Sequence, residues 1–165
     1  MGSGTYVAVC GPDPAGAELA AIAEQTGRLL ARAGATVVCG GHGGVMEAVA
    51  RGAAGEGGTV VGILPGFSRR EGNAFLTVAI PTGMGELRNG LIVRAADAVI
   101  AIGGEFGTLS EVALGLKRGL PVIGLGTWRL SKDGSDFADP ILRATSPEQA
   151  VEEALLAAKR RAGRG

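Results

Sequence analysis

Short, wholly apolar segments that end in a glycine-rich turn and lead into a helical pattern recur along this chain. The clearest one is AVIAI at 98–102, which is followed by a glycine turn at 103–107 and by helical periodicity that continues to Gly119. An apolar run of this length with no polar alternation indicates a strand that is covered on both faces. Because such strands alternate with helices here, the pattern predicts a parallel sheet with right-handed crossovers.

The same strand-and-helix plan extends over the whole sequence. We predict strands at 6–10, 36–39, 59–63, 76–80, 98–102 and 121–125. Helical spacing of apolar residues predicts helices at 17–33, 45–54, 83–95 and 108–119, and a last helix that opens at Ser146-Pro147-Glu148. The expected fold class is therefore α/β: one Rossmann-like domain over 1–165, with three layers and a central parallel sheet flanked by helices. Residues 67–73 and 126–140 are predicted to be loops.

The composition agrees with a buried, aliphatic sheet and excludes several classes of partner. The chain is 46% hydrophobic but only 4% aromatic, and its 30 glycines indicate many special turns. Lys+Arg 16 balance Asp+Glu 16, so no general attraction to nucleic acid or to an anionic membrane is expected. A run of about 18 apolar residues, as a membrane span requires, is missing. We expect a cytoplasmic protein with Cys10 and Cys39 as free thiols and with no metal site.

Glycine-rich turns follow several of the predicted strands, beginning at Gly11, at 40–44 and at 103–107. Ligands of parallel sheets bind where the carboxyl ends of the strands meet, so we expect these turns to face one crevice. A glycine turn lets backbone N–H groups converge, and a helix start adds unpaired donors and the positive end of the dipole. We therefore predict a phosphate site; the alternative is that the turns only pack helices closely on strands. The candidate phosphate- or nucleotide-binding residues are Gly11, Gly40, Gly41, Gly43, Gly104, Gly107 and Thr108.

Two common nucleotide-binding motifs are missing from these turns. The first predicted helix is not opened by G-x-G-x-x-G, and the second predicted strand does not end on an acidic residue. The absence of these two features argues against binding of NAD or FAD. The chain also lacks the G-K-[ST] sequence of a P-loop, so a nucleoside triphosphate bound in that way is not expected.

Several polar residues near the turns have two possible roles. Thr108 is either an ordinary hydroxyl at a helix start or a phosphate ligand. Glu111 is either a capping-box partner three residues later or a group that meets the sugar hydroxyls of a ligand. Arg88, near the start of a predicted helix, is either a surface charge or a site residue. His42 is more typical of a solvent-facing loop than of a catalytic base, and Glu105 either faces away from the site or weakens phosphate binding.

The pair Arg88-Asn89, followed by the stretch 98–111, resembles the LONELY GUY (LOG) superfamily, once labelled "possible lysine decarboxylase". The likeness extends over most of the chain, from residue 9 to residue 122. Members with known activity hydrolyse the N-glycosidic bond of nucleoside 5′-monophosphates, above all those of cytokinins, and release the base and ribose 5-phosphate.

By position in the LOG motifs, the resemblance implies catalytic roles for Arg88 and Glu111 and phosphate binding by Gly104, Gly107 and Thr108. The implied activity is that of a nucleoside 5′-monophosphate phosphoribohydrolase, which needs no cofactor. A lysine decarboxylase finds no support, because no lysine lies in a recognisable pyridoxal-phosphate context.

The sequence departs from the LOG motifs at Gly103, Glu105 and Asn89, where LOG proteins have proline, glycine and lysine. The Arg-Asn pair is closer to the branch that includes the molybdenum cofactor carrier protein. That branch leaves two other functions open: a non-catalytic carrier for a phosphorylated cofactor such as molybdopterin, or a nucleotide sensor. The expected partner is a nucleoside monophosphate or another phosphorylated small molecule. The resemblance also implies a homo-oligomer, either a dimer or a tetramer.

Overall fold

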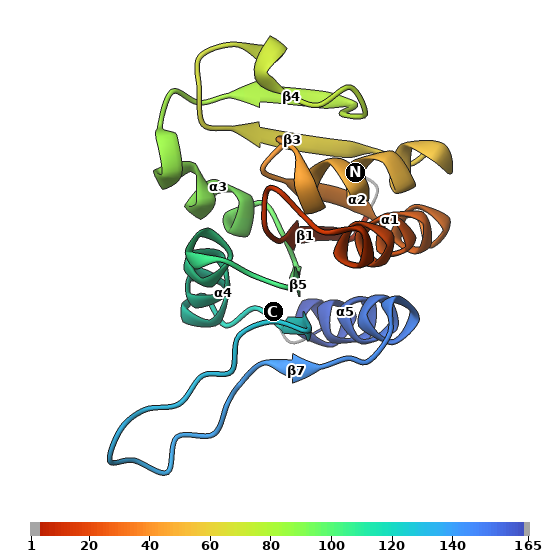
Figure 1. Ribbon diagram of the computed structural model, residues 1–165. Helices are drawn as coiled ribbons and strands as arrows, with labels where there is room; N and C mark the ends of the chain where they lie inside the picture. Colours follow the sequence, from red (N-terminus) through yellow and green to blue (C-terminus); the bar gives the residue numbers. More distant parts are fainter. Residues whose placement is uncertain (1–3, 164–165) are drawn as a thin grey trace.

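A seven-stranded sheet runs through the middle of this computed structural model, which describes residues 4–163 (Figure 1). The ends of the predicted domain, 1–3 and 164–165, lie outside the described residues. The strands are β1 (Tyr6–Cys10), β2 (Thr36–Cys39), β3 (Val60–Leu64), β4 (Val78–Pro81), β5 (Ala98–Ile102), β6 (Val122–Leu125) and β7 (Leu142–Arg143). The helices are α1 (Ala17–Arg32), α2 (Gly44–Gly55), α3 (Asn89–Arg94), α4 (Phe106–Lys117) and α5 (Pro147–Ala162), with 3-10 turns η1 (Arg69–Glu71) and η2 (Gly85–Arg88). Every pairing is parallel, in the order β4-β3-β2-β1-β5-β6-β7, which confirms the predicted fold class.

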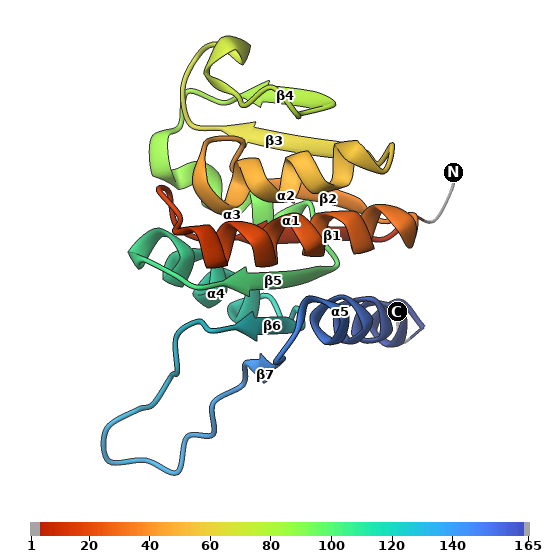
Figure 2. The same ribbon diagram turned by 45° about the vertical axis from the view of Figure 1, so that its right-hand side comes forward.

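Helices cover both faces of the sheet, which explains why its central strands are apolar throughout. Helices α1, α2 and α5 lie on one face, and α3 and α4 lie on the other (Figures 1 and 2). Alternate residues of β1 serve the two layers: Val7 and Val9 pack in the first core, and Ala8 and Cys10 pack in the second. Within residues 4–163, no helix has the length and apolar character needed to cross a membrane.

The chain reverses its direction of travel across the sheet between β1 and β5. From β1 it moves outward through β2 and β3 to β4, and then returns to place β5 on the other side of β1. Cys10, at the end of β1, is paired with Ala101 in β5. The loops that leave the carboxyl ends of these two strands therefore diverge, and such a switch point is where open α/β sheets bind ligands.

The structure differs from the sequence prediction mainly at short elements. The predicted helix at 83–95 begins later and is divided into η2 and α3; Gly83 and Gly85, with φ values of 65° and 57°, do not continue a right-handed helix toward the N-terminus. Strand β7 is not predicted, because two residues are too few to show a period. Residues 126–140 form the predicted loop, which extends far from the sheet in Figure 2. The predicted loop 67–73 contains the single 3-10 turn η1.

Glycines let α1 and α2 approach closely. A Cβ atom on Gly27 would lie 2.1 Å from the carbonyl oxygen of Val49, and one on Gly52 would lie 2.0 Å from that of Glu24. Both distances are far below van der Waals contact, so neither position accepts a side chain without moving a helix.

We expect Gly52→Ala to lower the free energy of unfolding by about 1–3 kcal/mol, because the added methyl group overpacks the contact between α1 and α2. Gly55→Ala in the same helix is the matched control, since a Cβ atom there would have no neighbour within 4 Å. It should leave stability unchanged or raise it by up to about 1 kcal/mol through helix propensity. Urea unfolding followed by circular dichroism measures both, and equal effects would contradict the packing argument.

Candidate functional site

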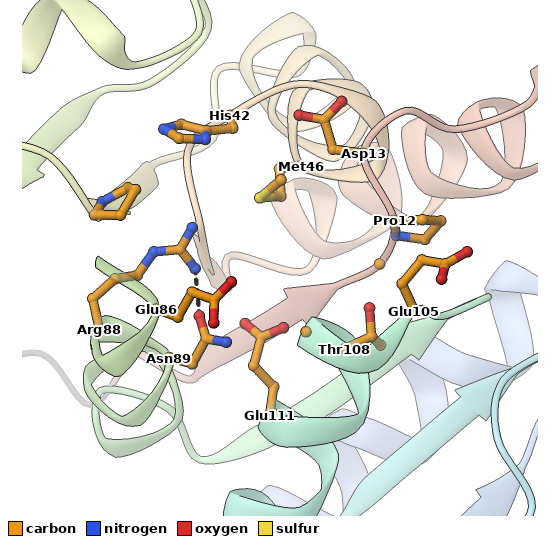
Figure 3. Close-up of a pocket in the computed structure, with 13 residues that line it drawn as sticks. Pro12, Asp13, His42, Met46, Glu86, Arg88, Asn89, Glu105, Thr108 and Glu111 are labelled. Carbon is orange, nitrogen blue, oxygen red and sulfur yellow. Dashed lines mark hydrogen bonds between the residues drawn. The ribbon is translucent and has the colours of Figure 1, made fainter. Parts of the chain in front are cut away.

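A cleft of about 370 Å³ opens at the switch point, beyond the carboxyl ends of β1 and β5 (Figure 3). Its walls come from the turn after β1, the start of α2, the end of β3, the junction of η2 and α3, and the first two turns of α4. The lining residues are Gly11, Pro12, Asp13, His42, Met46, Pro65, Glu86, Arg88, Asn89, Glu105, Gly107, Thr108 and Glu111. The cleft thus unites groups that are up to 100 residues apart in sequence.

The first turn of α4 presents unpaired backbone donors to this cleft. The first hydrogen bond of the helix runs from the Leu109 N–H to the Glu105 carbonyl, at 3.0 Å. The N–H groups of Phe106, Gly107 and Thr108 therefore precede the helical hydrogen-bond ladder and point away from it. Such donors, together with the positive end of the helix dipole, attract anions, and the phosphate site at this turn stays a prediction.

The glycine turn before α4 is shaped by backbone geometry and by Trp128. Gly103 has a φ of 59°, in the left-handed region that favours glycine. A Cβ atom on Gly104 would lie 2.9 Å from Nε1 of Trp128, and this indole N–H donates to the Glu105 carbonyl at 3.3 Å. Trp128 thus contacts the turn at Gly104 and Glu105, and Gly104 is not among the residues that line the cleft.

Gly107 differs from these glycines because nothing in the described structure requires it. A Cβ atom on Gly107 would have no neighbour within 4 Å. Glycine inside a helix costs about 1 kcal/mol relative to alanine, so the residue is unfavourable for the helix alone. Gly107 is one of the residues that line the cleft.

In the second glycine turn, 40–44, and the helix start after it, backbone N–H groups are already hydrogen-bonded to other residues of the protein. The Gly43 N–H donates to the Asp13 carboxylate at 3.1 Å, and the Val45 N–H donates to the Pro12 carbonyl at 3.0 Å. Gly40, Gly41 and Gly43 do not line the cleft. The turn forms a wall of the cleft, and its donors bind the loop that follows β1. Asp13 was missed as a site residue, although its place directly after a predicted strand was a usable signal.

Arg88 lies against this wall at the end of η2. A Cβ atom on Gly40 would be 2.8 Å from both terminal nitrogens of the Arg88 guanidinium, so glycine there makes room for the cation. Nη1 donates to Oδ1 of Asn89 at 2.6 Å, whereas Nε is buried without a partner among residues 4–163. Burial lowers the pKa of Arg88, and the nearby Glu111 carboxylate opposes that effect. The ordinary pKa of arginine is so far above neutrality that the side chain stays cationic at neutral pH.

Asn89 connects Arg88 to the first turn of α4. Its Nδ2 donates to Oγ of Ser110 at 2.9 Å, and the Ser110 hydroxyl donates to the carbonyl of Gly107 at 2.7 Å. From the sequence, Asn89 was recognised only as a departure from the LOG motif, and Ser110 was not predicted. The contact between Asn89 and Ser110 was not accessible from sequence, because the two residues come from different helices.

Glu111 is a buried acid in the second turn of α4. Only 7% of the residue is exposed, and its carboxyl group points into the same cleft as Arg88 (Figure 3). Burial raises its pKa to about 7, although the charge of Arg88 and the Cys10 side chain act in the opposite direction. The capping residue of α4 is Glu105, so Thr108 lies inside the helix and the capping-box interpretation of Thr108 and Glu111 is wrong.

The rim of the cleft is acidic. Asp13, Glu86 and Glu105 line it together with the buried Glu111, and Arg88 is the one Lys or Arg among the lining residues. Figure 3 shows Glu105 beside Pro12, on the opposite side of the cleft from Arg88. His42 lines the cleft, and its Nε2 is buried without a partner within the described chain. No cluster of His, Cys, Asp and Glu suited to a metal ion occurs among residues 4–163.

The parallel sheet, with a cleft at its switch point, defines a Rossmann-like α/β protein. Residues 4–151 match the SLOG cluster4 family, and the chain belongs to this family. An uncharacterised protein of Archaeoglobus fulgidus is 44% identical over 121 residues, which are 72% of this chain and 78% of that protein.

Solved structures with similar folds include molybdenum cofactor proteins. The molybdenum cofactor binding protein of Rippkaea orientalis is 33% identical, with a TM-score of 0.83 over 93% of this chain and 96% of that one. The molybdenum cofactor carrier protein of Chlamydomonas reinhardtii is 28% identical, with a TM-score of 0.81 over 93% and 98% of the two chains. These matches agree with the expected place of the chain, within the LOG-like proteins and near the carrier branch.

The raised pKa of Glu111 makes stability depend on pH. Its pKa is about 7 in the folded protein against an ordinary value of 4.5, so between these pH values the folded state retains a proton that the unfolded state releases. The raised pKa costs no stability below about pH 4.5. As the pH rises from 4.5 to about 7, the free energy of unfolding falls by up to about 3 kcal/mol, and this loss is constant at higher pH.

Glu111→Gln removes this titration, so the variant should gain stability relative to the wild type as the pH rises from 5 to 8. Urea unfolding of both proteins across that range measures the difference, and other titrating groups cancel between them. A difference that does not change with pH would show that Glu111 has an ordinary pKa.

Proposed function

We propose that the cleft binds a phosphorylated small molecule with its phosphate on the first turn of α4. Gly107 and Thr108 line the cleft, and their N–H groups in the first turn of α4 would provide the donors, together with the Thr108 hydroxyl. Arg88 supplies the positive charge in an otherwise acidic cleft. The names of the two molybdenum cofactor proteins agree with a ligand of this class.

The proposed reaction is hydrolysis of the N-glycosidic bond of a nucleoside 5′-monophosphate. The observation that supports it most directly is the position of Glu111, a buried carboxyl group three residues after Thr108 on the same helix. Residues at that spacing share a helix face and are separated by about 5 Å along the axis. A ribose held by its 5′-phosphate on the first turn would thus be presented to Glu111.

In this reaction the bond between C1′ and the base nitrogen breaks, and its electron pair leaves with the base, which takes up a proton. Positive charge develops on C1′ and the ring oxygen before water bonds to C1′ and loses a proton. The ionised Glu111 would stabilise that charge or orient the water, as carboxylates do in glycoside hydrolysis. Arg88 would hold the sugar phosphate, and the phosphate itself would fix the position of the sugar.

A second candidate function is a non-catalytic carrier of a phosphorylated cofactor such as molybdopterin. The similarity to molybdenum cofactor binding and carrier proteins favours it. The carrier would use the same phosphate site and would require no chemistry from Glu111. Release of free base from AMP, CMP or GMP supports the hydrolase. Stoichiometric binding of a fluorescent pterin without any base release supports the carrier instead.

Under the hydrolase proposal, Glu111→Gln should lower turnover of nucleoside monophosphate by about 100-fold or more, because the charge that meets the transition state is lost. Affinity for the phosphate should change little, since Gln is nearly isosteric. Glu86→Gln, at the exposed rim, is the matched control and should retain most activity. Liquid chromatography of the released base measures turnover. Equal turnover of Glu111→Gln and wild type would refute the catalytic role.

Gly107→Ala tests the phosphate position. Gly107 lines the cleft at the proposed phosphate position, so we expect an added methyl group to crowd the ligand and to lower the affinity for AMP about tenfold or more. The free energy of unfolding should stay the same or rise, because nothing in the protein contacts that methyl group. Calorimetric titration measures affinity, and Gly55→Ala is the control for the substitution itself. Unchanged affinity would place the phosphate elsewhere.

A further inference from the structure

We propose that Asn89 and Ser110 are positioning residues that join Arg88 to the first turn of α4 through one continuous chain of hydrogen bonds. The cation and the phosphate-binding turn would then act as one unit. The inference rests on the proposed phosphate site in the cleft, and it concerns how that site is held together.

Every bond in the chain has the same donor direction. The Arg88 guanidinium donates to the Asn89 side-chain carbonyl at 2.6 Å, a contact drawn as a dashed line in Figure 3. The Asn89 amide donates to the Ser110 hydroxyl at 2.9 Å, and that hydroxyl donates to the Gly107 carbonyl at 2.7 Å. Hydrogen bonds aligned in this way polarise one another, so each is strengthened by the next.

The chain ends on a peptide group that faces the proposed ligand. The carbonyl of Gly107 and the N–H of Thr108 belong to the same peptide unit. Because that carbonyl accepts from Ser110, the unit is polarised and the Thr108 N–H becomes a stronger donor. An anion bound at this N–H would in turn favour the aligned chain, so phosphate binding and the orientation of Arg88 are coupled.

Asparagine is the residue type that this position requires. One side-chain amide offers both an acceptor for Arg88 and a donor for Ser110. Aspartate would keep the acceptor for Arg88 but lose the donor, and lysine would offer no acceptor at all. Asn89 also provides the sole protein acceptor for the Arg88 guanidinium among the described residues. Without it, the half-buried cation would be held by packing alone.

A purely structural role, in which Asn89 and Ser110 only join α3 to α4, is the alternative. Because the two side chains hydrogen-bond each other, that role predicts coupled losses of stability but no loss of phosphate affinity in the folded protein. The two roles are therefore separated by a double-mutant cycle that measures both the free energy of unfolding and the affinity for phosphate, since only the positioning role couples the residues in affinity.

The test measures binding of AMP and of inorganic phosphate to the wild type, Asn89→Ala, Ser110→Ala and the double variant by calorimetric titration. We expect Asn89→Ala to weaken binding about tenfold and Ser110→Ala about fivefold. The effect of Ser110→Ala should shrink to less than about twofold once Asn89 is alanine, because the chain is already interrupted.

Arg94→Ala, an exposed cation on the same helix and outside the cleft, is the control and should bind as the wild type does. Additive effects of Asn89→Ala and Ser110→Ala would overturn the inference while leaving the phosphate site intact. A wild type that binds neither AMP nor phosphate would overturn the proposed function and this inference together. If Asn89→Ala fails to fold, the same cycle between Arg88→Ala and Ser110→Ala decides the question.

Discussion

Burial of the parallel sheet on both faces is the constraint on which the rest of the structure depends. With α1, α2 and α5 on one side and α3 and α4 on the other, the central strands have no solvated face to hold polar groups. Chemistry is therefore confined to the strand ends. Because the loops after β1 and β5 diverge at the switch point, that edge of the sheet opens into a cleft.

The charges in this cleft are unusual for a site that binds an anion. Arg88 is the one Lys or Arg among lining residues that include four carboxyl groups, of which Glu111 is buried. Under the proposed function, phosphate binding would therefore depend on backbone donors and on a well-oriented Arg88. The proton of Glu111 matters too, because its pKa of about 7 lies near neutrality. A bound anion favours the protonated acid, whereas an oxocarbenium-like transition state favours the carboxylate. A carrier and a hydrolase would thus use opposite protonation states of the same residue.

The two glycine turns illustrate how similar sequences acquire different roles. The turn at 103–107 leads into α4 with its first N–H groups open to the cleft. The turn at 40–44 leads into α2, where Asp13 and Pro12 already accept from Gly43 and Val45. Glycine allows both arrangements, and the loop that happens to lie beside each helix start decides between ligand binding and internal packing.

The sequence by itself determined the fold class, most element positions and the importance of the stretch that ends at Glu111, because apolar period and glycine placement are local properties of the chain. It also pointed to Arg88 through a family motif. Only the tertiary structure decided that Asp13 closes the second glycine turn, that Gly107 faces open space, and that Asn89 reaches Ser110. The contacts of Asp13 and Asn89 join segments that are 30 and 21 residues apart. For Gly107 the deciding fact is that a Cβ atom there would have no neighbour within 4 Å in the described chain. The tertiary structure also decided the raised pKa of Glu111. It arises from burial by residues of other elements, which no spacing in the sequence predicts.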